Sequence, residues 1–210
     1  MSRVILASAS PRRRELLAAV IDDFEVIPSE VEEELTGDGF VDAERLAFAK
    51  AHDISLRHPE ALVIGSDTIV FDETSEFGKP SDKAEAFAMW KRLRGRWHNV
   101  ATSVVVLAPG DERQLTEVAE VLLSDLSDNE ALAYIASKRP MDKAGAYAVQ
   151  DDDVPTVSRL EGCYCAVMGL PLWALYALLE SVSIPCRAPS ATLPRCAACP
   201  SRPLPSGNAS

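Results

Sequence analysis

The sequence predicts an α/β fold. Over residues 1–184, short apolar runs rich in β-branched residues alternate with segments of helical periodicity, and capping residues precede several of these segments. With 210 residues in all, the chain is long enough for one substantial hydrophobic core or for two small lobes. The sequence contains no internal repeat.

The first predicted helix begins with an unusual charge pattern. Residues 4–7 predict a short buried strand, and the spacing after Ser10 predicts a helix with Ser10 as its N-cap and Pro11 in its first position. The positive end of the helix macrodipole favours acidic residues in the first turn, but this turn carries Arg12, Arg13 and Arg14. Either these groups bind an anion such as a phosphate chain, or the turn is a solvated basic surface.

The other elements follow from the same signals. Apolar runs with β-branched residues predict further strands over residues 61–64, 69–71, 100–107, 118–123 and 163–168. Periodic apolar residues predict helices, which cover residues 43–56, the segment from Ser81 or Asp82 to Gly95, the segment that Ser127 opens, and residues 171–179. Ser127 and Glu130 have the spacing of a capping box, in which each side chain bonds the other residue's backbone N–H.

The overall charge is acidic, with 32 acidic and 21 basic residues and a formal net charge of −11. A field of this sign repels polyanions, which argues against nucleic acid or an anionic membrane as a partner and makes the arginines a local site for a small polyanion. We expect no membrane span and no signal peptide, because apolar stretches are short and arginines interrupt the N-terminus. Five cysteines without a disulfide-like framework predict a reducing cytoplasm.

The last part of the chain, residues 185–210, differs in composition. It holds 6 of the 14 prolines, no acidic residue, and neither helical nor strand periodicity, so we expect a disordered tail. Cys196 and Cys199 within it have CxxC spacing. Two cysteines without two further ligands are a weak zinc signal, and incidental thiols are the alternative.

Two charged residues lie in apolar segments. Asp67, within the sequence Gly65-Ser66-Asp67-Thr68, separates two apolar runs and either belongs to a turn or reaches a cleft, where it could bind a metal or act as general base. Lys50 lies four residues from both Leu46 and Ile54, on the apolar stripe of the predicted helix. A lysine on this stripe must be paired, extend to the surface, or point into a cleft.

Lys79, an acidic run and Gln150 are further candidates. Lys79, next to Pro80, is either an exposed loop lysine or one of the scattered lysines that could bind phosphate. Gln150 could read a base edge or lie on the surface, and we expect His98 to be structural. The acidic run either forms a solvated face or converges on a Mg²⁺ held by phosphates; it consists of Glu30, Glu32, Glu33 and Glu34.

The common phosphate-binding and hydrolytic motifs are absent from the sequence. It has no P-loop, no GxGxxG, no HExxH and no GxSxG. Phosphate binding would therefore come from the helix start at Ser10 and from lysines. Hydrolysis would use a metal-assisted water without a covalent intermediate.

A set of short motifs occurs in a characteristic order and spacing. It starts with Leu-Ala-Ser-Ala-Ser-Pro-Arg-Arg-Arg-Glu-Leu-Leu at residues 6–17 and includes Gly-Ser-Asp-Thr-Ile-Val at 65–70. The remaining members are residues 29–33, 46–51, 78–80, 95–100, 141–147, Gln150 and 169–171. Each motif is weak on its own, but the ordered set covers nearly all of residues 1–184 and resembles the Maf family of nucleoside triphosphate pyrophosphatases.

The resemblance implies an elongated Maf-like domain over residues 1–184, similar to the inosine triphosphate pyrophosphatases, with a mixed β-sheet flanked by helices and a central cleft between two lobes. It implies cleavage of the α–β phosphoanhydride of a nucleotide to the monophosphate and pyrophosphate by a cytoplasmic homodimer, with a divalent cation such as Mg²⁺ or Mn²⁺. Asp67 would activate the water and, with Glu33, bind the metal. The triphosphate would be held by Ser8, Arg13, Lys50 and Lys79.

The resemblance implies that Arg12, Thr68 and Gln150 determine substrate choice, and these three residues resemble those of the family branch that acts on dTTP and UTP. Such an activity would suit a role in nucleotide-pool sanitation or cell-division arrest. The chain departs from the family pattern at Asp151-Asp152-Asp153, where glycine-rich sequence is usual, at residues 137–140 and at Ala119. The alternatives are 7-methyl-GTP or another nucleotide, such as a modified pyrimidine, as substrate, and a non-catalytic nucleotide-binding regulator of cell division.

Overall fold

The structure is a computed structural model that describes residues 3–151 and 153–203. Its strands are β1 (Val4–Leu6), β2 (Glu25–Val26), β3 (Leu62–Phe71), β4 (Glu76–Phe77), β5 (Trp97–Ala108), β6 (Asp111–Leu123) and β7 (Val157–Glu161). Its helices are α1 (Pro11–Ala18), α2 (Gly39–Arg57), α3 (Lys83–Leu93), α4 (Asp128–Ala136), α5 (Tyr164–Met168), α6 (Leu172–Ser181), α7 (Pro189–Thr192) and α8 (Pro194–Ala197), with 3₁₀ turns at Arg139–Asp142 and Ala144–Ala146. No helix in the two described ranges is both long and apolar enough to cross a bilayer.

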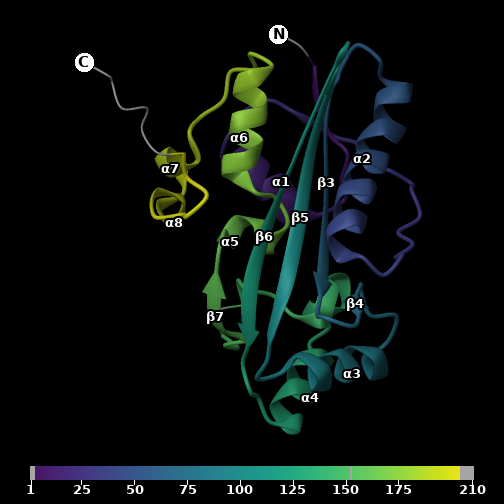
Figure 1. Ribbon diagram of the computed structural model, residues 1–210, viewed down its shortest axis with the longest axis vertical. Helices are drawn as coiled ribbons and strands as arrows, with labels where there is room; N and C mark the ends of the chain where they lie inside the picture. The colour runs from purple at the N-terminus through teal and green to yellow at the C-terminus, as the bar shows by residue number, and fades with distance from the viewer. Residues whose placement is uncertain (1–2, 152, 204–210) are drawn as a thin grey trace.

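A mixed sheet forms the centre of the molecule. The strand order is β2-β1-β3-β5-β6-β7, with β4 paired to β3. β1 is parallel to β2 and β3, whereas the pairs β3–β5, β5–β6 and β6–β7 are antiparallel. The long strands β3, β5 and β6 run along the length of the elongated molecule (Figure 1). This confirms the predicted α/β fold with a mixed sheet flanked by helices.

Helices cover both faces of the sheet. α2 packs on one face through Ala47, Ala51 and Ile54, while α1, α5 and α6 build the core of the opposite face (Figure 1). At the other end of the molecule, α3 and α4 pack around Trp90, whose Nε1 donates to the Ala146 carbonyl at 2.7 Å. Separate cores at the two ends of shared long strands produce two lobes.

The local predictions hold where a cap defines an element. Ser10 caps α1 with Pro11 in its first turn, Asp82 caps α3, and Ser127 forms the predicted capping box with Glu130. The helices predicted at residues 43–56 and 171–179 correspond to α2 and α6. These signals involve residues within one turn of each other, so they do not depend on the tertiary fold.

Two element predictions are wrong. The runs 61–64 and 69–71 are parts of one continuous strand, β3, so Asp67 lies in the middle of a strand and not in a turn. Residues 65–68 are also part of the strand, because β5 pairs with β3 continuously from Val63 to Phe71. The segment predicted as a strand at residues 163–168 instead forms the short helix α5 from Tyr164 to Met168, and Gly169 ends this helix in a left-handed conformation with φ of 115°.

The structure also differs from the expected disorder of the tail. Residues 185–203 contain α7 and α8, and Cys196 is buried in the core that α1, α5 and α6 share. The backbone N–H of Arg187 donates to the Val20 carbonyl at 2.8 Å. Pro189 and Pro194 occupy first turns of these helices, a position that proline suits. Residues 204–210 lie outside the described part of the chain.

Gly65 sets how closely α2 approaches the sheet. A Cβ atom at this position would contact the Ala47 carbonyl oxygen, and it would lie 2.7 Å from the Ala51 Cβ. We predict that Gly65→Ala lowers the free energy of unfolding in urea by about 1–3 kcal/mol or more, because neither backbone can yield. Gly78→Ala is the control, since its Cβ would meet only ordinary contact, 3.6 Å from Leu35 Cδ1. Equal denaturation midpoints for the two variants would contradict this account.

His98 predicts a pH dependence of stability. It is buried, its Nε2 lies 2.8 Å from the Tyr147 hydroxyl, and burial lowers its pKa from 6.5 to about 4. The folded state therefore disfavours the protonated ring. The contribution of neutral His98 to the free energy of unfolding is complete above pH 6.5 and is lost as the pH falls toward 4. We expect the stability advantage of wild type over His98→Gln to shrink by roughly 3 kcal/mol across this range in urea titrations. A pH-independent difference would refute it.

Candidate active site

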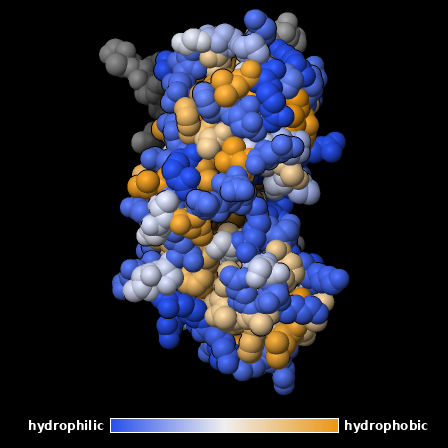
Figure 2. All heavy atoms as spheres, turned by 90° about the vertical axis from the view of Figure 1, so that its right-hand side faces the viewer, coloured by the Kyte–Doolittle hydropathy of each residue, from blue (hydrophilic) through white to orange (hydrophobic). Residues whose placement is uncertain are grey.

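A cavity of about 710 Å³ lies between the two lobes, where the surface is hollowed (Figure 2). The loop from β1 into α1 and the middle of β3 contribute its inner walls, including Ser8, Arg13, Asp67 and Thr68. Lys50 of α2, Lys79 and the segment from Asp142 to Gln150 complete the lining. The cavity thus contains every site residue that the sequence predicted: Ser8, Arg12, Arg13, Glu33, Lys50, Asp67, Thr68, Lys79 and Gln150.

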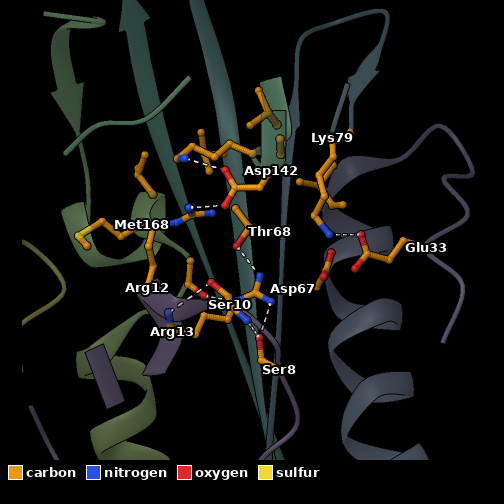
Figure 3. Close-up of a pocket in the computed structure, with 18 of the residues that line it drawn as sticks. Ser8, Ser10, Arg12, Arg13, Glu33, Asp67, Thr68, Lys79, Asp142 and Met168 are labelled. Atoms are coloured by element: carbon orange, nitrogen blue, oxygen red, sulfur yellow. Dashed lines mark hydrogen bonds and ion pairs between the residues drawn. The ribbon is translucent and has the colours of Figure 1, made fainter. Parts of the chain in front are cut away.

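Arg13 is fixed at the inner end of the cavity by three contacts. Its Nε donates to the Gly169 carbonyl at 2.8 Å, and its Nη2 donates to Thr68 Oγ1 at 3.2 Å. Nη1 is 3.5 Å from Ser8 Oγ (Figure 3). Burial lowers the pKa of the guanidinium, which Asp67 and Glu33 partly oppose. The group is therefore a cation with little water around it, and such a cation attracts an anion more strongly than an exposed one.

The other two arginines of this turn have different surroundings. Arg12 pairs with Asp142, with Nη1 3.2 Å from Oδ2. Arg14 is exposed and does not line the cavity. Arg12 and Arg13 thus line the cavity, whereas Arg14 fits the solvated alternative.

On the α2 side of β3, two carboxylates converge on one lysine. Lys50 Nζ contacts Asp67 Oδ1, and it lies 2.6 Å from Glu33 Oε1. The second oxygen of Glu33 lies 2.7 Å from Lys79 Nζ (Figure 3). Burial alone would raise the pKa of Glu33, but Lys50 and Lys79 lower it to about 2. Lys50 is 7% exposed and Asp67 5% exposed, so the lysine is paired in the cleft and does not extend to the surface.

The alternation of β3 places its polar side chains on opposite faces. Asp67 faces Lys50 of α2, whereas Ser66 Oγ donates to the carbonyls of Ser103 and Gly169 at 2.8 and 3.0 Å. Thr68 lies on the same side as Ser66 and accepts from Arg13 and, at 3.0 Å, from Thr102. The strand therefore separates the carboxylate from the hydroxyls that hold Arg13 and α5.

Two residues that sequence reasoning gave no role lie beside Arg12. Asp142 accepts from Arg12 and also pairs with Lys143 at 2.7 Å, and all three residues line the cavity. Asp142 and Lys143 lie within the motif at residues 141–147, which was a signal of their location but not of their contacts. Gln150 also lines the cavity.

The aspartates after Gln150 are bound elsewhere. Asp151 accepts from the Tyr134 hydroxyl at 2.7 Å, and Asp153 pairs with Arg139 at 2.6 Å. Neither residue lines the cavity, and Asp152 lies outside the described residues. Two of the three carboxylates are thus bound to residues other than those that line the cavity.

The acidic run contributes one side chain to the cavity. Glu33 lines it, whereas Glu30, Glu32 and Glu34 do not. Within residues 3–151 and 153–203, no three His, Cys, Asp or Glu side chains are arranged to hold a metal ion by themselves. Glu33 and Asp67 nevertheless meet at one point, and Mg²⁺ is commonly held by one or two carboxylates together with substrate phosphates. The pair fits a cation shared with a phosphorylated substrate.

Comparison with known proteins agrees with this geometry. The family model "Maf-like protein" matches residues 3–182. A dTTP/UTP pyrophosphatase of Aquifex aeolicus is 42% identical over 87% of this chain and 96% of the relative. Another dTTP/UTP pyrophosphatase, from Thermomicrobium roseum, is 42% identical over 95% of this chain and 94% of the relative. The crystal structure of protein VC0702 from Vibrio cholerae covers 88% of this chain and 99% of its own, with a TM-score of 0.44 and 13% identity. By the family match and the two relatives at 42% identity, the chain belongs to the Maf family.

Proposed function

We propose that this protein hydrolyses dTTP and UTP to the monophosphate and pyrophosphate. The observation that carries the proposal is the cluster of buried Asp67 and Lys50 with the more exposed Glu33, which lines the same cavity as Arg13. Relatives that cover most of the chain are named dTTP/UTP pyrophosphatases. A cavity of about 710 Å³ has the size that small-molecule sites usually have.

The phosphate chain would bind at the start of α1. The first backbone N–H groups of a helix attract anions, and the side chains around them are Ser8, Arg13, Lys50 and Lys79. Arg13 is pre-positioned by Gly169 and Thr68, so binding requires little ordering of its side chain. Lys79 is 55% exposed at its side chain and can turn from Glu33 toward a phosphate.

The carboxylate pair would hold the cation. Glu33 and Asp67 would bind one Mg²⁺ or Mn²⁺ together with the substrate phosphates, and the bound cation would neutralise phosphate charge and lower the pKa of water. Asp67 would accept a proton from the water that attacks the α-phosphorus, and the α–β anhydride bond would break. Arg13 and Lys79 would stabilise the charge that develops on the leaving pyrophosphate.

Base selection would involve Gln150, Arg12 and Thr68, which line the same cavity. The Gln150 amide has both a donor and an acceptor for a pyrimidine edge. Asp142, itself paired with Lys143, orients Arg12. Thr68 would act through Arg13, to which it is hydrogen-bonded.

We also propose a homodimer that acts in the cytoplasm and does not bind nucleic acid. The net charge of −11 supports the last point, because the field around the protein repels a polyanion. A role in nucleotide-pool sanitation follows from the proposed reaction.

Replacing Asp67 tests the proton acceptor. Asp67→Asn should lower kcat for dTTP by about 10²-fold or more, because the amide cannot accept the proton of the attacking water. Pyrophosphate release with Mg²⁺ or Mn²⁺ measures turnover, and circular dichroism checks that the variant is folded. Glu32→Gln is the matched control, since Glu32 is exposed and does not line the cavity. A folded Asp67→Asn variant with wild-type turnover would remove Asp67 from this role.

A nucleotide panel tests the substrate. Pyrophosphate release should be fastest with dTTP and UTP, and at least about 10-fold slower with 7-methyl-GTP. Gln150→Ala should reduce this preference mainly by raising KM for the pyrimidine nucleotides, because an amide contact to the base is lost. Faster turnover of 7-methyl-GTP than of dTTP and UTP would show that 7-methyl-GTP is the preferred substrate instead. No hydrolysis of any nucleotide would favour the nucleotide-binding regulator.

A further inference from the structure

Four cysteines from two distant segments meet beside α5. Cys163 and Cys165 lie at the start of this helix, and Cys196 and Cys199 belong to α8 and the residues after it, next to α5 (Figure 1). Cys165 Sγ is 3.6 Å from Cys196 Sγ. Cys163, Cys165 and Cys196 are buried, Cys199 packs against the same core, and all four are free thiols.

The thiols influence one another as a group. Burial and then the Cys199 thiol raise the pKa of Cys163 to about 12. Hydrogen bonding to Cys196, together with burial, raises the pKa of Cys165, and Cys163 and Cys199 add to this effect. Cys163 thus contacts Cys199, and Cys165 contacts Cys196, so the four thiols form one group in which a bound cation would favour the thiolate form.

The geometry resembles a ligand set more than a disulfide. In a tetrahedral zinc–thiolate site with Zn–S bonds of about 2.3 Å, the sulfur atoms lie about 3.8 Å apart, whereas a disulfide bond is about 2.05 Å. The observed 3.6 Å is near the first value. The sequence supplies CxC at residues 163–165 and CxxC at 196–199. The fold therefore adds the two further ligands whose absence made the CxxC pair a weak signal.

We propose that Cys163, Cys165, Cys196 and Cys199 bind one Zn²⁺ and so fasten residues 185–203 to the catalytic domain. Four thiols lose four protons to the solvent as four Zn–S bonds form, which leaves a site of charge −2. Arg195 lies 4.3 Å from the centroid of the Tyr164 ring, between the two ligands of α5, and provides positive charge nearby.

Zinc binding requires these thiols to rearrange. In the described part of the chain, no three His, Cys, Asp or Glu side chains are already arranged to hold a metal ion, so the four thiol groups would have to turn toward one point. Cys199 lies just after the four-residue helix α8 and is partly exposed, so its side chain can move without disturbing the core. Trp173 Nε1 already holds the Cys196 carbonyl at 2.9 Å, which fixes the neighbouring ligand.

The site would support α5 from its N-terminal end. This helix has five residues and lacks a side-chain cap at Cys163. At its other end, the Gly169 carbonyl accepts from Arg13 and Ser66. Zinc would thus stabilise α5, the helix whose C-terminal end holds Arg13 in the cavity. The zinc itself would take no part in the reaction.

Elemental analysis of the full-length protein tests the proposal independently of its activity. Protein purified under reducing conditions and loaded with Zn²⁺ should retain about one zinc per chain after gel filtration. The double variant Cys165→Ser/Cys196→Ser should retain none. Cys186→Ser is the control and should retain zinc, because Cys186 lies in the same segment but outside the thiol group. A chelator should lower Tm in wild type and in the control but not in the double variant.

Substitution by Co²⁺ gives a second readout if the double variant does not fold. Wild type should show the intense visible bands of tetrahedral thiolate coordination, and the single variant Cys199→Ser should weaken them. Zinc retention in the double variant equal to that of wild type would overturn the proposal. So would failure of wild type to retain zinc, or a Cys165–Cys196 disulfide that persists in wild type purified with reductant.

Discussion

The position of Asp67 in the middle of a buried strand constrains the rest of the structure. A carboxylate at 5% exposure is unstable unless a cation is beside it, and Lys50 supplies that cation from α2. Lys50 is itself buried, so it needs its two carboxylate partners, Asp67 and Glu33. Removing Lys50 or moving α2 away from β3 would leave the charge of Asp67 buried without a partner. The structure therefore depends on holding β3, α2 and the loop that carries Glu33 together.

Close packing makes that cluster possible. Gly65 lets the backbone of α2 lie against β3, two residues before Asp67, and this distance brings Lys50 within reach. On the other face, Ser66 and Thr68 bond the end of α5 and Arg13. The single motif Gly65-Ser66-Asp67-Thr68 thus contacts α2, α5 and the start of α1, so its four residues have different physical tasks.

Sequence patterns predicted what depends on near neighbours. The caps at Ser10 and Ser127 and the amphipathic helix α2 were correct because their determinants lie within a few residues. The continuity of β3 could not be predicted, because pairing with β5 decides it. The order of residues 185–203 was missed for a similar reason: Cys196 becomes buried against α5, more than 25 residues away in the sequence. The resemblance indicated the site residues, but the contact of Asp142 with Arg12 appears only in the fold.

The charges that line the cavity bear on how a nucleotide enters it. Five cationic side chains line it, namely Arg12, Arg13, Lys50, Lys79 and Lys143, and five acidic ones, namely Glu33, Asp67, Glu76, Glu85 and Asp142. Most of these cations are already paired with carboxylates, so the lining has no net excess of positive charge for a triphosphate. A bare triphosphate would have to compete with Glu33 and Asp67 for Lys50 and Lys79. A divalent cation that arrived with the phosphates would reverse this competition, because Glu33 and Asp67 would hold the cation and leave the lysines to the substrate.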